Sequence, residues 1–333
     1  MNVGSSLRLG LAIARSAWLR DRPFLLYYKP TARCDARCAI CDRWRHARPA
    51  SEELPLATVT LLLERFRRAG CAVLTLWGGE PLLRVDLPEI LVAAHRLGYR
   101  TSMCTNAREL ERRAADVVPH LDVLLCSLDG YGAVHDRMRG VEGMFDRVLA
   151  GLRAARAHPG CDVKIWACLH RESAGQVEQL ADLAGELGVG IEFFPLSPIA
   201  GYNDALRLPP DELRAAIERV RARKRAGAPV RNPDRALELL ARGEAFACNF
   251  GRIAISMDHV GNIYTCEDPQ GTPLAPWGTY RDFDPEAVFR SPEHRAARAR
   301  LRSCNRCRLP CVTELAGSLP LALAGMAASR AAR

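Results

Sequence analysis

Residues 23–41 read PFLLYYKPTARCDARCAIC, an apolar run followed by a polar segment that carries three cysteines. The run at 24–28 has the aromatic and aliphatic composition of a buried strand. Cys34, Cys38 and Cys41 follow it with C-x3-C-x2-C spacing. Three thiolates hold only three irons of a [4Fe-4S] cube, so the fourth iron stays open to a ligand. A zinc site is the alternative, because thiolates also bind zinc, although zinc motifs usually supply paired C-x2-C units.

The N-terminal two thirds of the chain alternate strands with helices. Apolar, β-branched or aromatic runs lie at 24–28, 72–77, 99–104, 122–128, 162–169 and 190–196. Amphipathic helical periodicity covers 56–69, 87–97, 107–117, 143–157, 174–187 and 209–223. Alternating strands and helices form parallel sheets with right-handed crossovers. Six such units predict an α/β fold, a partial (β/α)6 TIM-like barrel over residues 23–225.

Polar motifs follow the predicted strands at one end of this barrel. Gly78-Gly79-Glu80-Pro81 comes after the second strand, Thr105-Asn106 after the third, and Ser127 and Asp129 close the fourth. Ser127 and Asp129 share a face because they are two residues apart on a strand, and the alternative is a side-chain turn before Gly130. Active sites of such barrels lie at the C-terminal ends of the strands. The motifs and the cysteine segment are therefore expected to converge there.

The cysteine spacing together with the GGEP motif resembles the radical S-adenosylmethionine (radical SAM) enzymes. The resemblance implies a [4Fe-4S] cluster on Cys34, Cys38 and Cys41, whose open iron binds the amino and carboxylate groups of S-adenosylmethionine (SAM). It implies reductive cleavage of SAM to a 5′-deoxyadenosyl radical, which takes a hydrogen atom from a substrate. The residues that it assigns to SAM are Ile40, Gly78, Gly79, Glu80, Pro81, Ser127, Asp129 and Arg139.

The resemblance also implies roles for individual residues. The main chain of the GGEP motif accepts hydrogen bonds from the methionine ammonium, and Glu80 adds negative charge. Ile40 packs on adenine. Arg139 lies in HDRMRG at 135–140, which resembles a segment of many relatives, and is the expected partner of the methionine carboxylate; a solvated arginine is the alternative. Ala107 stands where relatives often have glycine after Thr-Asn.

A second set of cysteines lies near the C-terminus and comprises Cys248, Cys266, Cys304, Cys307 and Cys311. Strands at 253–256 and 262–265 are predicted to form a hairpin between the first two. This pattern resembles the SPASM/twitch extension of radical SAM enzymes over residues 226–314, and implies an auxiliary [4Fe-4S] cluster. Five cysteines rather than seven favour the shorter twitch form, with Cys248, Cys266, Cys304 and Cys307 as ligands. Cys311 replaces a ligand, acts in catalysis or is structural, and a zinc ribbon is the alternative for the whole set.

Glu267 directly follows Cys266, and the resemblance implies that it deprotonates the substrate as the substrate is oxidised. A carboxylate in a dry site has its pKa raised towards neutrality, which suits a general base. A solvated acid in a turn is the alternative, and Glu192 in the sixth strand is a second candidate. With an auxiliary cluster to take an electron, the expected reaction is a two-electron oxidation.

The composition limits the cellular compartment and the classes of partner that we expect for this protein. The chain has 333 residues, 13 cysteines and a net charge of +9. An odd and clustered cysteine count favours metal ligation in a reducing compartment, so a cytoplasmic protein is expected. Only three lysines occur among 47 basic residues, which indicates an arginine-rich composition rather than a nucleic-acid-binding surface. We therefore expect no nucleic acid partner.

Both ends of the chain carry apolar stretches. Residues 1–22 are predicted to form an amphipathic helix, which either packs under the barrel or makes peripheral contact with an anionic membrane. The tail at 315–333 is too short in its apolar part to span a bilayer.

A radical SAM enzyme also needs an electron donor such as flavodoxin or ferredoxin. The stretch before residue 24 is too short for a leader-peptide recognition domain, so we expect a small-molecule or lipid substrate. The alternatives are a peptide-modifying enzyme of the RiPP-maturase or sulfatase-maturase kind, and a non-enzymatic, zinc-stabilised binding protein.

Overall fold

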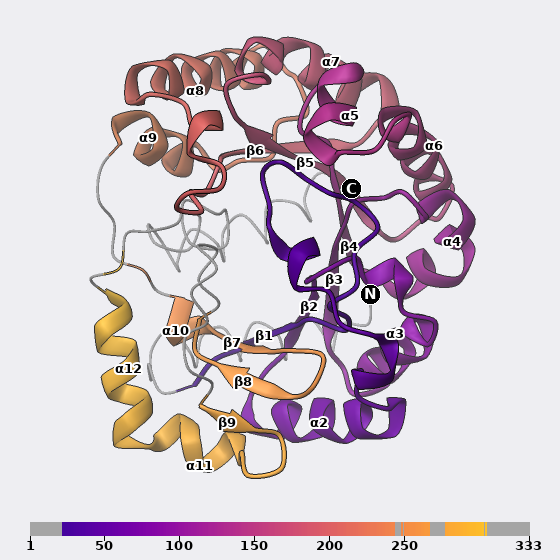
Figure 1. The fold of residues 1–333 in the computed structure, drawn as a ribbon, viewed down its shortest axis with the longest axis vertical. Coiled ribbons are helices and arrows are strands. Elements are labelled where there is room, and N and C mark those ends of the chain that lie inside the picture. Colours follow the sequence, from indigo (N-terminus) through magenta and orange to yellow (C-terminus); the bar gives the residue numbers. More distant parts are fainter. Residues whose placement is uncertain (1–21, 244–247, 249, 267–276, 303, 305–333) are drawn as a thin grey trace.

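The computed structural model describes residues 22–243, 248, 250–266, 277–302 and 304. Its core is a curved sheet of six parallel strands with helices covering the outer face, which forms an open barrel (Figure 1). The six strands are β1 Leu25–Tyr28, β2 Val73–Leu76, β3 Arg100–Thr105, β4 Val123–Ser127, β5 Asp162–Leu169 and β6 Gly190–Pro195. The helices that follow them are α2 Leu56–Ala69, α3 Leu87–Arg96, α4 Leu110–Val117, α5 Ala133–Arg139, α6 Met144–Arg156, α7 Val177–Leu187 and α8 Pro210–Arg225. The predicted partial barrel is confirmed.

The two faces of the strands differ, as a strand with a period of two requires. Leu26 and Tyr28 of β1 and Leu74 and Leu76 of β2 are fully buried against the helices. The residues between them face the interior of the barrel and are only half-buried. The outer side chains thus form the main core, and the inner ones remain available to line a site.

The start of α4 differs from the prediction of a helix from 107. Ala107 has φ of 61°, in the left-handed region that L-residues other than glycine seldom adopt. The backbone therefore turns at this position, and α4 begins three residues later, at Leu110. Helix α5 has only seven residues, too few for a helical period to be read in the sequence, and the prediction missed it.

The C-terminal hairpin extends the same sheet beyond β1. Strand β7 Ala254–Met257, which follows the short helix α10 Phe250–Ile253, pairs parallel to β1. β8 Asn262–Tyr264 and β9 Gly278–Thr279 then continue the sheet in antiparallel pairs. The remaining helices of the described chain are α9 Asp234–Arg242, which contacts α8, and α11 Pro285–Arg290 and α12 Pro292–Arg302. The described part of 226–314 is therefore joined to the barrel through the β1–β7 pair.

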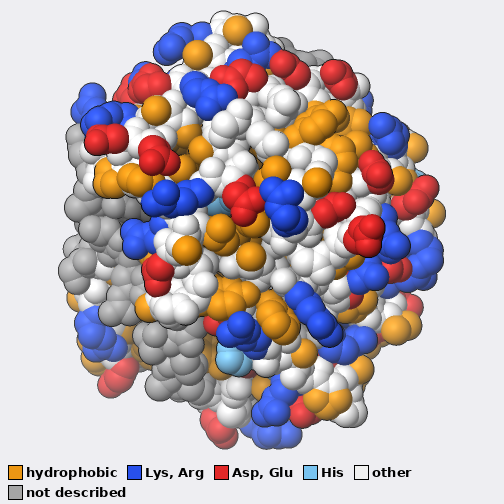
Figure 2. Space-filling view, turned by 45° about the horizontal axis from the view of Figure 1, so that its top comes forward, with side chains coloured by type: hydrophobic (Ala, Val, Ile, Leu, Met, Phe, Trp, Pro, Cys, Tyr) orange, Lys and Arg blue, Asp and Glu red, His pale blue; other side chains and the backbone are white. Residues whose placement is uncertain are grey.

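The predicted helix at 1–22, apart from Arg22, and the tail at 315–333 lie outside the described residues. Within the described part of the chain, no helix combines the length and the apolar character that crossing a bilayer requires. On the face drawn in Figure 2, lysine and arginine side chains alternate with aspartate and glutamate over the helices.

Candidate active site

The cysteine segment leaves the C-terminal end of β1 and is held first by the turn after β2. Glu80 N donates to Arg33 O at 2.7 Å, and Gly79 N donates to Thr31 O at 3.3 Å. A Cβ atom on Gly79 would lie 2.0 Å from Arg33 O, so only glycine allows this approach. The close contact of the two glycines is therefore with the backbone that leads into Cys34.

The carboxylate of Glu80 fixes the end of β3. Its oxygens accept hydrogen bonds from Thr105 Oγ1 at 2.7 Å, Asn106 N at 2.7 Å and Leu82 N at 3.0 Å. Burial raises the pKa of Glu80 to about 7, although these hydrogen bonds oppose the shift. The sequence predicted that Glu80 adds negative charge next to SAM. The structure shows that its oxygens also accept hydrogen bonds from three donors within the chain.

Asn106 and Arg108 hold the cysteine segment from the side of β3. Asn106 Nδ2 donates to Asp35 Oδ1 at 2.7 Å, and Arg108 Nη1 donates to Asp35 O at 2.6 Å. Asp35 lies between the first two cysteines of the motif, so its position fixes the turn between them. Neither residue was predicted to belong to the site, because Asp35 is an ordinary polar loop residue in the sequence and Arg108 falls within the helix predicted from 107.

Helix α5 supplies a further anchor for the segment. Arg37 N donates to Arg139 O at 3.0 Å and Ala39 N donates to Met138 O at 2.8 Å. Gly140 ends α5 with φ of 64°, and a Cβ atom there would lie 2.6 Å from Arg37 O. The last carbonyls of the helix, which have no partners within it, thus hold the backbone on both sides of Cys38.

The loop after β6 closes over the segment. Tyr202 Oη donates to Cys38 O at 2.6 Å, and Asn203 Nδ2 donates to Ile40 O at 3.1 Å. The segment is therefore fixed by parts of the chain that follow β2, β3, β4 and β6, and its conformation depends on the folded barrel.

A buried ion pair lies beside the central cysteine. Arg139 pairs with Asp129, whose side chain is 1% exposed, and Arg139 Nη1 reaches Cys38 Sγ at 3.8 Å. Burial alone would lower the pKa of Arg139, but the charges of Asp129 and Cys38 raise it above its ordinary value. Burial raises the pKa of Cys38 to about 11, and Arg139 opposes this shift. Arg139 is thus a buried cation, not the solvated arginine of the alternative interpretation.

One cavity of about 230 Å³ brings these groups together. Its lining includes the residues predicted for the cluster and for SAM, namely Cys34, Cys38, Ile40, Cys41, Gly78, Gly79, Glu80, Ser127, Asp129 and Arg139. Pro81 is buried behind the turn and does not line it. Two larger hollows, of about 520 and 410 Å³, lie among charged surface side chains and contain none of the cysteines.

Several buried polar atoms in the cavity wall have no hydrogen-bond partner among the described residues. They include Trp77 Nε1, Trp166 Nε1 and Ser197 Oγ. A buried donor without a partner is costly, so these positions call for acceptor atoms of a bound molecule. Three thiols together with unsatisfied donors fit a cluster and a polar ligand such as SAM.

The inner strand faces add residues that the prediction did not place in the site. Cys104 on β3 and Cys168 on β5 both line the cavity. Trp166 and Cys168 lie two residues apart on β5, and Phe194 on β6 packs against Trp166 with ring centroids 4.8 Å apart. Strand alternation counted back from Asn106 would have found Cys104, whereas no sequence motif marks the ends of β5 and β6.

Glu192 faces the interior but does not line the cavity. Its carboxylate accepts a hydrogen bond from Lys164 Nζ at 2.9 Å, and its side chain is 10% exposed. The second candidate for a proton acceptor is therefore held in an ion pair.

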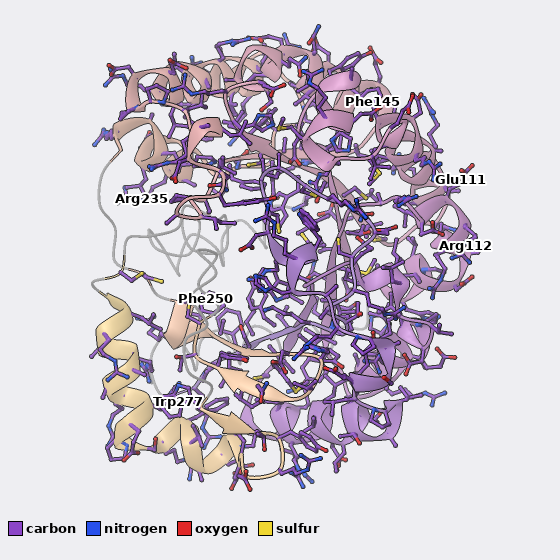
Figure 3. The ribbon with its side chains drawn as sticks, viewed as in Figure 1. Glu111, Arg112, Phe145, Arg235, Phe250 and Trp277 are labelled. Atoms are coloured by element: carbon purple, nitrogen blue, oxygen red, sulfur yellow. The ribbon has the colours of Figure 1, made fainter. Side chains whose placement is uncertain are left out.

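The C-terminal cysteines within the described residues approach one another. Cys248 is buried with Phe250 and Ile253, and Cys266 and Cys304 pack against the same apolar cluster. Burial is the main cause that raises the pKa of Cys248, and the nearby Cys304 adds to it. Phe250 stacks on Tyr27 of β1 with ring centroids 5.3 Å apart, which ties this cluster to the barrel (Figure 3).

Glu267, Cys307 and Cys311 lie outside the described residues. In the described part of the chain, no three His, Cys, Asp or Glu side chains are arranged to hold a single metal ion.

The chain resembles proteins of one family. Residues 28–184 match the model of the Radical SAM superfamily. The chain is 27% identical over 169 residues to Fe-coproporphyrin III synthase of Methanosarcina barkeri, and the aligned residues cover 50% of this chain and 42% of that protein. It is 27% identical over 218 residues to PqqA peptide cyclase of Gluconobacter oxydans, with 63% and 60% covered. It is 32% identical over 161 residues to pre-heme d1 synthase of Dinoroseobacter shibae, with 48% and 40% covered. The chain thus spans about half the length of these relatives.

Solved structures show the same fold. Streptococcus suis SuiB bound to S-adenosylmethionine superposes with a TM-score of 0.69 at 20% identity, over 84% of this chain and 68% of that chain. The structure of anSMEcpe with bound AdoMet and Cp18Cys peptide gives a TM-score of 0.66 at 17% identity, over 82% of each chain. The family match and the geometry of the cavity agree, and residues 28–184 of this chain form a domain of the Radical SAM superfamily, whose enzymes use a [4Fe-4S] cluster and S-adenosylmethionine.

Proposed function

We propose that Cys34, Cys38 and Cys41 hold the SAM-binding [4Fe-4S] cluster and that the cavity of about 230 Å³ holds SAM. The observation that carries this proposal is the convergence of three thiols, the glycine turn and the Asp129–Arg139 pair on one cavity at the C-terminal ends of parallel strands. When bound, the cluster and SAM supply a 5′-deoxyadenosyl radical that takes a hydrogen atom from the substrate.

The residues of the chain bind and orient in this scheme. The backbone of Gly78 and Gly79 and the Glu80 carboxylate face the methionine ammonium, which a carboxylate stabilises. Arg139 contacts Cys38, and it offers its guanidinium both to this thiol and to a ligand carboxylate. Ser127 and Asp129 face the ribose, and Ile40 supplies an apolar contact for adenine. Pro81 holds the turn from behind.

The substrate that we propose is a small molecule or a lipid that undergoes a two-electron oxidation. Relatives named as an Fe-coproporphyrin III synthase and a pre-heme d1 synthase support a small organic substrate. A peptide is the second candidate, favoured by the relative named PqqA peptide cyclase and by the structures of SuiB with precursor peptide SuiA and of anSMEcpe with a peptide.

The C-terminal region at 226–314 is proposed to hold an auxiliary [4Fe-4S] cluster on Cys248, Cys266, Cys304 and Cys307. A four-thiolate cluster has no open iron, so its expected role is to accept an electron. Support comes from the approach of the first three of these cysteines to one apolar cluster. Glu267 is proposed to accept the substrate proton, and Cys311 is an additional thiol of the region.

The cellular setting is also proposed. An electron donor such as flavodoxin or ferredoxin reduces the SAM-binding cluster in the cytoplasm. Residues 1–22 provide peripheral membrane contact if the substrate is a lipid, and liposome flotation with and without residues 1–20 tests this; equal absence of binding contradicts it.

Anaerobic reconstitution tests the proposed function. We expect a brown protein that contains iron and sulfide, an EPR signal after reduction that changes when SAM is added, and release of 5′-deoxyadenosine. The Cys34→Ala/Cys38→Ala/Cys41→Ala variant is expected to lose the SAM-sensitive signal. Cys161→Ala is the matched control. Cys161 is a half-buried thiol just before β5, at the N-terminal end of that strand, whereas the cavity lies at the C-terminal ends of the strands. A colourless, zinc-containing wild type would favour the zinc-stabilised binding protein.

Deuterium transfer separates the candidate substrates. A deuterated cell extract is divided into small-molecule, lipid and peptide fractions, and each is incubated with the reduced enzyme and unlabelled SAM. We expect deuterium in 5′-deoxyadenosine with the small-molecule or the lipid fraction. Transfer from the peptide fraction alone would contradict that proposal and support the peptide candidate.

A further inference from the structure

Two buried histidines contact the backbone of Asp129 from opposite sides. Asp129 N donates to His135 Nδ1 at 3.0 Å, and His170 Nε2 lies 2.8 Å from Asp129 O. Both imidazoles are fully buried. Neither histidine lines the cavity, so neither is placed to touch a ligand there.

The partners fix the protonation of both rings. An amide N–H only donates, so His135 Nδ1 is an acceptor without a proton. A carbonyl oxygen only accepts, so His170 Nε2 carries the proton. The two rings are therefore the same Nε2–H tautomer, but they present different nitrogens to Asp129, His135 its unprotonated Nδ1 and His170 its protonated Nε2. Burial lowers the pKa of His135 to about 4 and also lowers the pKa of His170, which agrees with neutral rings.

The two contacts determine where the Asp129 carboxylate lies. Its Oδ1 accepts a hydrogen bond from Cys168 N at 3.0 Å, and its other oxygen pairs with Arg139. His135 and Arg139 lie four residues apart on α5, so one helix holds both the backbone and the carboxylate of Asp129. The same helix accepts hydrogen bonds from Arg37 N and Ala39 N of the cysteine segment. Asp129 thus has a fixed position relative to Cys38.

His170 is itself supported. Ser173 Oγ accepts a hydrogen bond from His170 N at 3.1 Å and donates to Cys168 O at 3.1 Å. Ser173 is fully buried. The turn after β5 is therefore built to present His170 Nε2 to the Asp129 carbonyl.

We infer that His135 and His170 are positioning residues that clamp Asp129 between them and so set the geometry with which the Asp129–Arg139 pair meets SAM and Cys38. This inference rests on the proposed function, because it assumes that Asp129 and Arg139 face SAM. Outer residues that orient the groups touching a metal or its ligand typically change affinity by about 10- to 100-fold when they are replaced.

The two rings contact Asp129 through different nitrogens, which allows a crossed test with amide side chains. Asparagine reaches as far as imidazole Nδ1, and glutamine reaches as far as Nε2. His135→Asn and His170→Gln therefore retain the contacts to Asp129, and His135→Gln and His170→Asn do not. The binding of SAM to the reconstituted protein is measured by equilibrium titration, together with the EPR spectrum of the reduced cluster and the thermal unfolding of each variant.

We expect His135→Asn and His170→Gln to bind SAM about as the wild type does. We expect the crossed variants to bind SAM about 10-fold or more weakly, with a changed EPR spectrum because Arg139 also contacts Cys38. Equal SAM affinity of the two amides at each position would overturn the inference. If a crossed variant does not fold, Ser173→Ala replaces it; weaker SAM binding supports the inference, and unchanged binding overturns it.

Failure of the proposed function is recognised separately. In that case the wild type itself shows no SAM-sensitive EPR signal and releases no 5′-deoxyadenosine, whatever the histidine variants do.

Discussion

Replacement of Gly79 by alanine tests the claim that the glycine turn positions the cysteine segment. The added Cβ atom would lie 2.0 Å from Arg33 O, 2.8 Å from Arg33 C and 3.0 Å from Ala32 C. Real Cβ contacts are essentially never shorter than 3.0 Å, so the turn and the segment must separate by at least 1.0 Å, the difference between 3.0 and 2.0 Å. All three obstructing atoms belong to the backbone, so no side-chain rotation relieves the contact.

The energetic consequence follows from this displacement. The 2.7 Å hydrogen bond from Glu80 N to Arg33 O is lost at such a separation, and leaving a buried donor unpaired costs about 1–3 kcal/mol. Overpacking of a rigid region costs a further 1–3 kcal/mol, roughly. We therefore expect the free energy of unfolding to fall by about 2–6 kcal/mol, and cluster incorporation to fall because Cys34 follows the displaced segment.

Urea unfolding and the iron content after reconstitution are the assays. Gly175→Ala is the matched control, because a Cβ atom there meets nothing within 4 Å and its φ is not positive. We expect the control to match the wild type in both assays. If Gly79→Ala unfolded like the control and bound as much iron, the claim that this glycine positions the cysteine segment would be refuted.

Three other substitutions probe the surroundings of the site. Ala107→Gly is expected to raise the free energy of unfolding by about 0.5–1 kcal/mol, because φ of 61° strains alanine and suits glycine; a lower urea midpoint contradicts this. The pKa of Glu80 is raised above its ordinary value of 4.5 to about 7. Between these two pH values the folded state binds more protons than the unfolded state, so the free energy of unfolding falls as the pH rises. Urea midpoints across this range should fall less steeply in Glu80→Gln, and equal slopes would disprove the assignment. Asp129→Asn leaves the buried Arg139 cation without its carboxylate and is expected to lower the free energy of unfolding by about 3–5 kcal/mol. The double variant Asp129→Asn/Arg139→Met should recover part of that loss in the same urea assay. No recovery would speak against a buried ion pair.

The strands, most helices and the convergence of the polar motifs followed from the sequence because they depend on local patterns. Apolar runs separated by amphipathic stretches specify parallel strands covered by helices, and parallel strands place all their C-terminal ends at one edge. The predicted strands at 72–77 and 122–128 correspond to β2 Val73–Leu76 and β4 Val123–Ser127. The C-x3-C-x2-C spacing and the GGEP motif predicted the family because both are local in the sequence.

The contacts among the motifs were decided only by the tertiary structure. Glu80 bonds Thr105 and Asn106, which lie 25 and 26 residues away along the chain. The pairing of β7 with β1 joins segments more than 200 residues apart, and nothing in either strand specifies its neighbour. Partners of this kind depend on which loops the folded barrel brings together, because hydrogen bonds between distant residues leave no period or spacing in the sequence.

The sequence by itself therefore determined the chemistry that this protein can carry, since thiol spacing and strand-end motifs are local properties. The tertiary structure decided how that chemistry is held in place. Gly79 meets the backbone before Cys34, α5 ties Asp129 to Cys38, and two buried histidines hold Asp129 from both sides. These arrangements exist only in the folded barrel, because each joins residues that only folding brings within hydrogen-bond distance.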